Sequence, residues 1–319
     1  MITFHRYQPQ DLPGLTTVWN DVFSGGPNFT SLTEQDFVDR VTAQPSFDPA
    51  TLLVASDAGR AVGFVHFGPL TNFWYSLSER KPDPSTGQIW ALVAPPADRG
   101  LTQALLDAAV ARLVSDGAKR IIIHPSWVQG SQPFYNGIAG AYEMPGLAES
   151  RTELREVLRD NGFEPIAHYA TPELDLSDRA RFSSLKQEAE QIWQRIEGAG
   201  VKTAVRHVSS AFFPPRRVVD VVWGLDTIAM TAYGLWEEYT RQYKRRLYGI
   251  TGVQVAKRWR GLGLGKVVMV LAMEAAARDG AEAIHLHVYK DNEPAWNLYH
   301  RALGFQPKYA WMTLAKHLQ

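Results

Sequence analysis

Two parts of the chain repeat the same order of strand, turn, helix and strand, and this repeat restricts the fold most strongly. An amphipathic pattern at residues 101–117 ends at Asp-Gly and precedes an apolar stretch at 121–124, and residues 264–280 and 284–287 repeat the arrangement. Apolar residues at helical spacing and a glycine after the last turn are typical of a helix and its end. We expect two diverged copies of one β-α-β unit; chance similarity is the alternative.

Further matches extend the repeat to most of the chain. Asn-Gly-Phe at 161–163 follows the first copy and Leu-Gly-Phe at 303–305 follows the second. Apolar runs bounded by turn residues precede each helix, which is typical of strands. The expected strands are residues 51–57, 61–68, 87–95, 218–225, 227–236 and 247–256, and a further helix is expected around 184–197.

Antiparallel strands followed by one crossover in each half predict an α+β (mixed α/β) fold. Each half is expected to form a central mixed, largely antiparallel sheet flanked by helices. We place the two domains at residues 1–175 and 176–319, because the pattern of the first copy ends before the helix around 184–197.

Composition excludes several classes of protein. Because 33 basic and 33 acidic side chains cancel, bulk attraction to nucleic acid is not expected. The chain has no cysteine, which removes a disulfide scaffold, a thiolate zinc site and a cysteine nucleophile. The apolar run from Val267 to Met273 is far shorter than the roughly 20 residues of a membrane span. We expect a cytoplasmic protein, a monomer or homodimer, with no metal and with neither nucleic acid nor membrane as partner.

A glycine-rich turn between an expected strand and the second helix is the strongest chemical signal. Gly261, Gly263 and Gly265 alternate with other residues, and four basic side chains lie between Lys257 and Lys266. Glycines let backbone N–H groups converge, and a helix start adds unpaired N–H groups, so together they favour a phosphate. The spacing fits neither a P-loop nor a dinucleotide fingerprint. The alternative is a turn with an exposed basic face.

A second motif follows this turn and its helix. Residues 292–304 are expected to form a short helix with Asn292 as N-cap and with Tyr299 on its inward face. Arg-x-x-Gly-x-Gly at 258–263, followed by Asn-x-x-Ala-x-x-Leu-Tyr-x-x-x-x-Gly-Phe at 292–305, resembles the GCN5-related N-acetyltransferase (GNAT) family. The resemblance is strong over residues 215–315, and the first half resembles a second, degraded copy. The two-domain layout resembles that of tandem members of the family such as mycothiol synthase.

The resemblance implies an acyltransferase that moves the acetyl group of acetyl-CoA directly to an amine of a small molecule or peptide. The acyl-CoA site would lie in the second domain, with Tyr299 as the general acid that protonates the leaving thiolate. The residues implied to bind acetyl-CoA are Thr251, Gly252, Val253, Arg258, Trp259, Arg260, Gly261, Leu262, Gly263, Leu264, Gly265 and Asn292.

The general base is not identified by the resemblance. By the resemblance, the positions where many relatives have a Glu or His correspond to Leu247 and Gly249, which accept no proton. Glu237 and Glu238 are candidates from elsewhere, as are Tyr248, His285 and His287, and a water relay or an already neutral amine would need none of them.

The first copy lacks the phosphate turn, because residues 95–102 contain two prolines and one glycine. We expect a structural or acceptor-binding role for it, and residual CoA binding is the alternative. Two other functions stay open for the whole protein. One is an acyl-CoA-binding regulatory or structural protein that has lost its chemistry, and the other is a nucleotide-binding enzyme of another fold.

Overall fold

The computed structural model describes residues 1–70, 85–124, 134–140, 142, 146–197, 200–210 and 213–318. Backbone contacts divide the chain into two compact units, and each is described by itself. Unit 1 consists of residues 1–169 and 310–319, and unit 2 of residues 170–309. The domains expected from the sequence were 1–175 and 176–319. The difference is largest at the C-terminus, where the last ten residues are part of unit 1.

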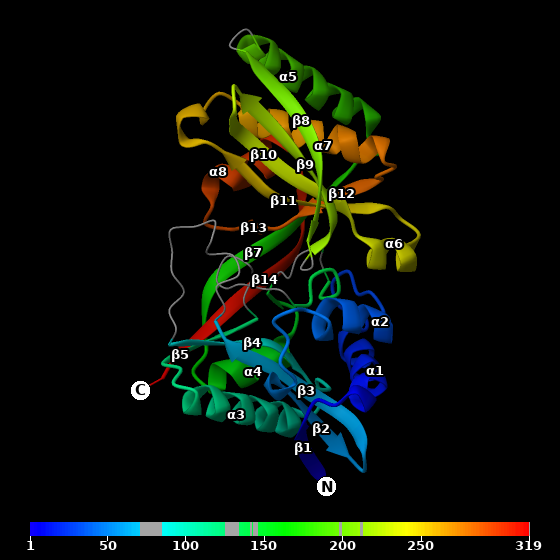
Figure 1. Ribbon diagram of the computed structural model, residues 1–319, viewed down its shortest axis with the longest axis vertical. Coiled ribbons are helices and arrows are strands. Elements are labelled where there is room, and N and C mark those ends of the chain that lie inside the picture. The colour runs from blue at the N-terminus through cyan, green and yellow to red at the C-terminus, as the bar shows by residue number, and fades with distance from the viewer. Residues whose placement is uncertain are drawn as a thin grey trace. The chain divides into compact units, whose positions relative to one another are not determined.

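Unit 1 is a mixed sheet with helices on both faces (Figure 1). Its strands follow the order β1-β2-β3-β4-β5 and then the C-terminal part of β14. Neighbours are antiparallel except for β4 and β5, which are parallel and joined through α3. The elements are β1 (Ile2–Arg6), η1 (Pro9–Asp11), α1 (Leu12–Phe23), α2 (Glu34–Phe37), η2 (Val38–Thr42), η3 (Pro49–Thr51), β2 (Leu52–Asp57), β3 (Arg60–Pro69), β4 (Thr86–Val93), α3 (Arg99–Ser115), β5 (Arg120–Ile123), β6 (Leu147–Ala148), α4 (Thr152–Asp160) and β7 (Glu164–Asp175), whose last residues belong to unit 2.

The alternation of strand side chains gives unit 1 two cores. Val65 and Leu92 face one side and pack with α3 and α4, whereas Phe64 and Val93 face the other and pack with α1 and α2. Because successive strand residues point to opposite faces, a strand covered on both sides must be apolar at nearly every position. This explains why every residue of β4 is buried.

Unit 2 repeats this strand plan as β8-β9-β10-β11-β12 followed by the C-terminal part of β7. Its one parallel pair among these strands, β11 and β12, is joined through α7. The elements are α5 (Arg179–Glu197), β8 (Val201–Ser210), β9 (Phe213–Trp223), β10 (Asp226–Leu235), α6 (Glu237–Tyr243), β11 (Leu247–Val255), η5 (Lys257–Trp259), α7 (Leu264–Arg278), β12 (Ala283–Leu286), β13 (Val288–Tyr289), α8 (Glu293–Trp296), η6 (Asn297–Leu303) and β14 (Gln306–His317), whose last residues belong to unit 1.

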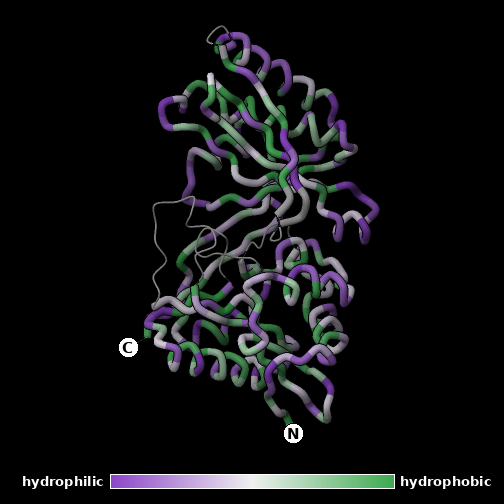
Figure 2. Tube along the Cα trace, viewed as in Figure 1, coloured by the Kyte–Doolittle hydropathy of each residue, from purple (hydrophilic) through white to green (hydrophobic). Residues whose placement is uncertain are grey.

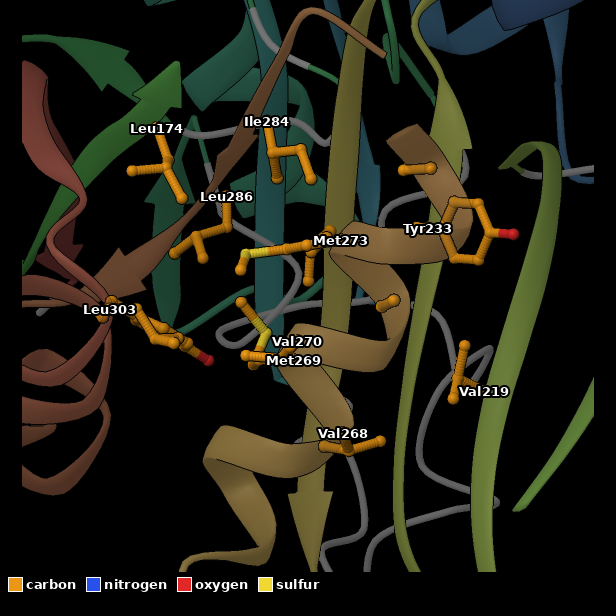
Figure 3. Packing of buried hydrophobic residues seen from close by; sticks show 14 of the residues in the cluster. Leu174, Val219, Tyr233, Val268, Met269, Val270, Met273, Ile284, Leu286 and Leu303 are labelled. Carbon is orange, nitrogen blue, oxygen red and sulfur yellow. The ribbon is translucent and has the colours of Figure 1, made fainter. Parts of the chain in front are cut away.

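Helix α7 is the centre of the unit 2 core. Met269 and Met273 point from it toward Leu286 on β12, while Tyr233 lies on its other side (Figure 3). Helix α5 packs against α7 and is largely hydrophilic along its length (Figure 2), with Leu185 and Ala189 as its buried side chains. The fixed position of α7 also fixes the turn that precedes it.

Each unit is completed by a strand from the other half of the sequence. In unit 1, β5 pairs with residues 314–317 of β14, and Leu314 is buried in the core of that unit. In unit 2, β12 pairs with residues 173–175 of β7. Neither half of the sequence therefore contains all the strands of its own sheet.

The sequence analysis predicted the fold class and the principal elements correctly. All six expected strands and the helix expected around 184–197 are present, with small shifts at their ends. Residues 292–304 form one short helical turn continued by a π-helix rather than one regular helix. Strand β8 and helix α1 were not expected. Among the described residues, no helix is long and apolar enough to cross a membrane.

Leu314→Ala tests the strand exchange. It removes a buried side chain from the core of unit 1, so we expect a loss of about 2–5 kcal/mol in the stability of that unit. Hydrogen exchange should accelerate at the amides of β5, while those of β12 keep most of their protection. Leu303→Ala, in the core of unit 2, is the matched control and should give the reverse pattern. Acceleration confined to β12 in the Leu314 variant would contradict the assignment.

Candidate functional site

A cleft of about 1050 Å³ lies wholly within unit 2. Its walls are the C-terminal end of β11 with the facing part of β10, the turn into α7, and the segment formed by α8 and η6. The residues from the sequence prediction that line it are Val253, Trp259, Arg260, Gly261, Gly263, Leu264, Gly265, Asn292 and Tyr299.

The divergence of β11 from β12 opens this cleft. The two strands pair only from Leu247 to Ile250, whereas β11 continues to Val255. Opposite β10, the register shifts between Thr251 and Gln254, and Gly252 has φ +63°. A glycine in the left-handed region with one extra residue is typical of a β-bulge, which bends a strand. Of the residues at the bulge, Val253 lines the cleft, whereas Thr251 and Gly252 do not. Thr231 donates its hydroxyl to the Thr251 carbonyl at 3.1 Å and so holds the bulge in place.

The turn into α7 presents a row of backbone N–H groups. Gly261 and Gly263 have φ +81° and +83°, a backbone conformation that costs conformational energy in residues with a Cβ. Gly263 is the N-cap of α7 and supplies no capping side chain. Among the described residues, none accepts a hydrogen bond from the amides of residues 261–265. These groups and the positive end of the helix dipole form a site for an anion.

Close packing explains two of the three glycines. A Cβ on Gly263 would lie 3.0 Å from the Ile192 side chain of α5, and one on Gly265 would lie 3.2 Å from Leu298 of η6. A Cβ on Gly261 would meet nothing within 4 Å. Gly261 therefore serves the backbone conformation, whereas Gly263 also lets α5 approach the turn.

The basic residues of the turn have different roles. Arg258 points out of the cleft, where it forms an ion pair with Asp226 at 3.1 Å and lies 5.3 Å from the Trp223 ring. Lys266 pairs with Glu188 of α5 and, through that hydrogen bond, lowers the pKa of the Glu188 carboxyl. Arg260 donates to the carbonyl of Val255 at 3.1 Å. The cleft lining includes Lys257, Arg260 and Lys266 but, among the described residues, no Asp, Glu or His.

Asn292 and Tyr299 lie on the opposite wall. The Asn292 carboxamide caps α8 by accepting the Ala295 amide at 3.3 Å, as its sequence position predicted. Tyr299 is 7% exposed, and its carbonyl accepts the Phe305 amide at 2.9 Å, which closes the last turn at Gly304. The π-helix thus holds the tyrosine in the wall of the cleft while its backbone is tied to the start of β14.

The comparisons with known proteins agree with this geometry. The model of the acetyltransferase (GNAT) family matches residues 19–139 and again 186–305. The chain belongs to the GNAT family. The two matches give it a tandem layout, as expected from the repeat. Sequence comparison with curated proteins finds no match.

Solved GNAT structures share the fold at low identity. One is the GCN5-related glucosamine N-acetyltransferase region of a fungal multi-domain GH3 β-N-acetylglucosaminidase, which is 16% identical with a TM-score of 0.65. That match covers 99% of this chain and 38% of the other. A tandem GNAT protein from the clavulanic acid biosynthesis pathway is 15% identical over 99% and 98% of the chains (TM-score 0.61). A GCN5-related N-acetyltransferase from Sphaerobacter thermophilus is 11% identical over 99% and 95% (TM-score 0.59).

The candidate bases of this GNAT protein lie away from the cleft. Glu237 is exposed and lines a separate hollow of about 440 Å³ together with Tyr248, and Glu238 is buried. His285 is buried beside Trp236 at 5.0 Å, and burial lowers its pKa to about 3. Burial also lowers the pKa of His287, whose Nδ1 lies 2.8 Å from the Thr171 hydroxyl. The structure brings none of these five side chains to the wall that holds Tyr299.

The corresponding turn of unit 1 is closed by a carboxylate. Asp98 is the N-cap of α3, and its carboxylate accepts the Leu101 amide at 2.9 Å. The N-cap of α7 provides no such acceptor. The prolines at 95 and 96 donate no N–H. A negative charge at this helix start repels a phosphate, so the start of α3 is less suited to a phosphate than the start of α7.

A pair of variants tests the local geometry of the turn. Gly261→Ala should lower stability by about 1–2 kcal/mol through backbone strain alone. Gly263→Ala should cost about 1 kcal/mol more, because its Cβ also meets Ile192. Urea unfolding measures both losses of stability. Adding Ile192→Ala to Gly263→Ala should remove the additional loss, which a double-mutant cycle reports as a favourable coupling. Equal losses for the two glycines would contradict the packing assigned to Gly263.

Proposed function

We propose that unit 2 binds acetyl-CoA in its cleft and transfers the acetyl group directly to an amine of a small molecule or peptide. The observation that carries the proposal is the uncapped, unbonded turn 261–265 facing the same cleft as Tyr299 in a member of the GNAT family. Two similar structures support the class of reaction: one is described as a glucosamine N-acetyltransferase region, and the other is named with reference to AcCoA.

The turn fits the diphosphate of coenzyme A. Amides 261–265 would donate to its oxygens, and the α7 dipole would add to the attraction. Lys257 and Arg260 supply positive charge at the lining, and the absence of acidic side chains among the described lining residues avoids repulsion. Trp259 and Leu264 of the same turn also line the cleft, whereas Arg258 and Leu262 do not.

The bulged strand fits the acyl end of the donor. Residues 251–253 lie where β11 has left β12, so one backbone edge can serve the pantetheine amides and the thioester carbonyl. Asn292 would contact the pantetheine from the other wall. Backbone donors aimed at the oxygen that gains charge in the transition state contribute about 10²–10³ each.

The reaction balances without a covalent enzyme intermediate. The amine nitrogen attacks the thioester carbon, the C–N bond forms and the C–S bond breaks. We assign Tyr299 as the general acid whose hydroxyl proton goes to the departing CoA sulfur. The proton lost by the amine leaves to solvent, since the described cleft lining holds no carboxylate or imidazole, and the Tyr299 phenolate takes up a proton from solvent. A neutral amine is therefore the reacting form.

The same feature favours the competing function, an acyl-CoA-binding protein without activity. Among the described lining residues, Tyr299, Lys257 and Lys266 are the acid–base groups. A protein that has lost its catalytic base but still binds acyl-CoA would have the same lining. Within the proposal, unit 1 has a structural or acceptor-binding role and the protein acts as a monomer or homodimer. Neither point is needed for the site in unit 2.

Gly261→Asp tests the donor site. It places a carboxylate among the free amides without a clash, so the affinity for CoA should fall at least about tenfold, measured by calorimetry. Gly59→Asp in the β2–β3 turn is the matched control, since Gly59 has φ +79° and equally open surroundings. It should leave the affinity unchanged. Undiminished affinity in the Gly261 variant would remove the site from this turn.

Tyr299→Phe tests the chemistry separately from binding. We expect kcat to fall by about 10²–10⁴ while the Kd for acetyl-CoA changes little, because only the proton donor is lost. The measurement is CoA release with a panel of amines, and thermal unfolding controls for the fold. An unchanged rate would refute the general-acid role. CoA binding with no release by the wild-type protein for any amine would instead support the inactive binding protein.

A further inference from the structure

Unit 1 contains a partly open cavity of about 300 Å³ that the acyl-transfer proposal does not use. It lies between the C-terminal part of β4, strand β6, the segment after α1 and the start of α4, all within this unit. Its lining is mostly apolar and aromatic, as in pockets that hold small molecules. The apolar lining includes Phe23, Phe29, Trp90, Ile138, Leu147 and Trp311.

Arg151 is a cation in this wall that forms no ion pair among the described residues. Its side chain is half-buried, and its guanidinium lies over the Phe23 ring at 4.9 Å. Burial lowers the pKa of Arg151. Among the described residues, none forms an ion pair or a hydrogen bond with the guanidinium group. A partly buried charge that forms no ion pair costs stability, and a ligand that supplies the opposite charge would offset this cost.

His124 is a second unsatisfied polar group in the same wall. It is 4% exposed, and its Nε2 has no hydrogen-bond partner among the described residues. It follows β5 with φ +47°, held there by the hydrogen bond of its amide to the Ile89 carbonyl. Burial lowers its pKa to about 3, so the ring is neutral near pH 7 and can donate one hydrogen bond.

The start of α4 adds to the same end of the cavity. Arg151 is the N-cap of this nine-residue helix and provides no capping side chain. Glu153 and Leu154 in its first turn also line the cavity, and the positive end of the helix dipole favours an anion there. Glu153 is exposed and forms no ion pair with Arg151, although its charge raises the pKa of Arg151 and partly offsets the effect of burial.

We propose that this cavity binds a small carboxylic acid with an aromatic or aliphatic body. The carboxylate pairs with Arg151 and accepts from His124, and the body fills the space between Trp90 and Trp311. One cation and one neutral imidazole match a monoanion. Coenzyme A does not fit the site, since Asp98 and the prolines at 95 and 96 close the turn where its diphosphate would bind.

Ligand-observed NMR with phenylacetate on the full-length protein tests the site. We expect saturable binding that weakens at least about tenfold in Arg151→Gln and also in His124→Asn, a residue that tolerates positive φ. The neutral probe phenylacetamide should bind at least about tenfold more weakly to the wild-type protein. Arg159→Gln, an exposed arginine of the same helix, is the matched control and should bind as the wild type does.

The melting temperature distinguishes ligand binding by Arg151 from a structural role, because loss of a structural contact would lower it. Arg151→Gln should melt at the same or a higher temperature than the wild type, because it removes an unpaired charge, and phenylacetate should raise the melting temperature of the wild type only. A lower melting temperature with unchanged binding, or equal binding of phenylacetamide, would overturn the proposal. Displacement of phenylacetate by acetyl-CoA in the Gly261→Asp background would also overturn it, by making the cavity a remnant CoA site.

Discussion

Each unit depends on a pair of parallel strands that are paired over only four residues. In unit 2, β11 pairs with β12 from Leu247 to Ile250, and in unit 1, β4 pairs with β5 from Thr86 to Ile89. In each unit the longer strand continues beyond this pairing, and the opening beside it becomes a cavity. Because a helix must connect parallel strands, α7 and α3 bring their N-termini to the same end as the opening. One constraint of topology therefore produces a cavity in each unit.

The chemistry of the two openings differs because of a few residues at the helix starts. Before α7, Gly263 leaves the first amides free, and Lys257 and Arg260 surround them with positive charge. Before α3, the Asp98 carboxylate occupies that place. In unit 1, Arg151 at the start of α4 instead lines a largely aromatic and apolar cavity. The first opening suits a diphosphate, and the second suits a single carboxylate.

Much of this was predictable from local sequence patterns. The glycine turn, the helix after it and the cap at Asn292 follow from spacing, since glycine and capping residues act within a few positions. The exchange of β7 and β14 was not predictable, because strand pairing between distant segments leaves no local signal. Strand β8 was missed since its exposed residues, such as Lys202 and Arg206, hide the alternation. The ion pairs of Arg258 and Lys266 were not predictable either, because their partners are distant in the sequence. The same holds for the lack of an ion pair at Arg151 among the described residues.

Hydrogen exchange of the backbone amides with and without CoA is the most direct test of the central claim that the turn before α7 is the donor site. Amides 261–265 have no partner among the described residues, so they should exchange fast in the free protein and become protected when CoA binds. The amides of residues 251–253 should follow, while the amides of residues 98–102 should not change. Protection at residues 98–102 without protection at 261–265 would place the donor in unit 1 and contradict the claim.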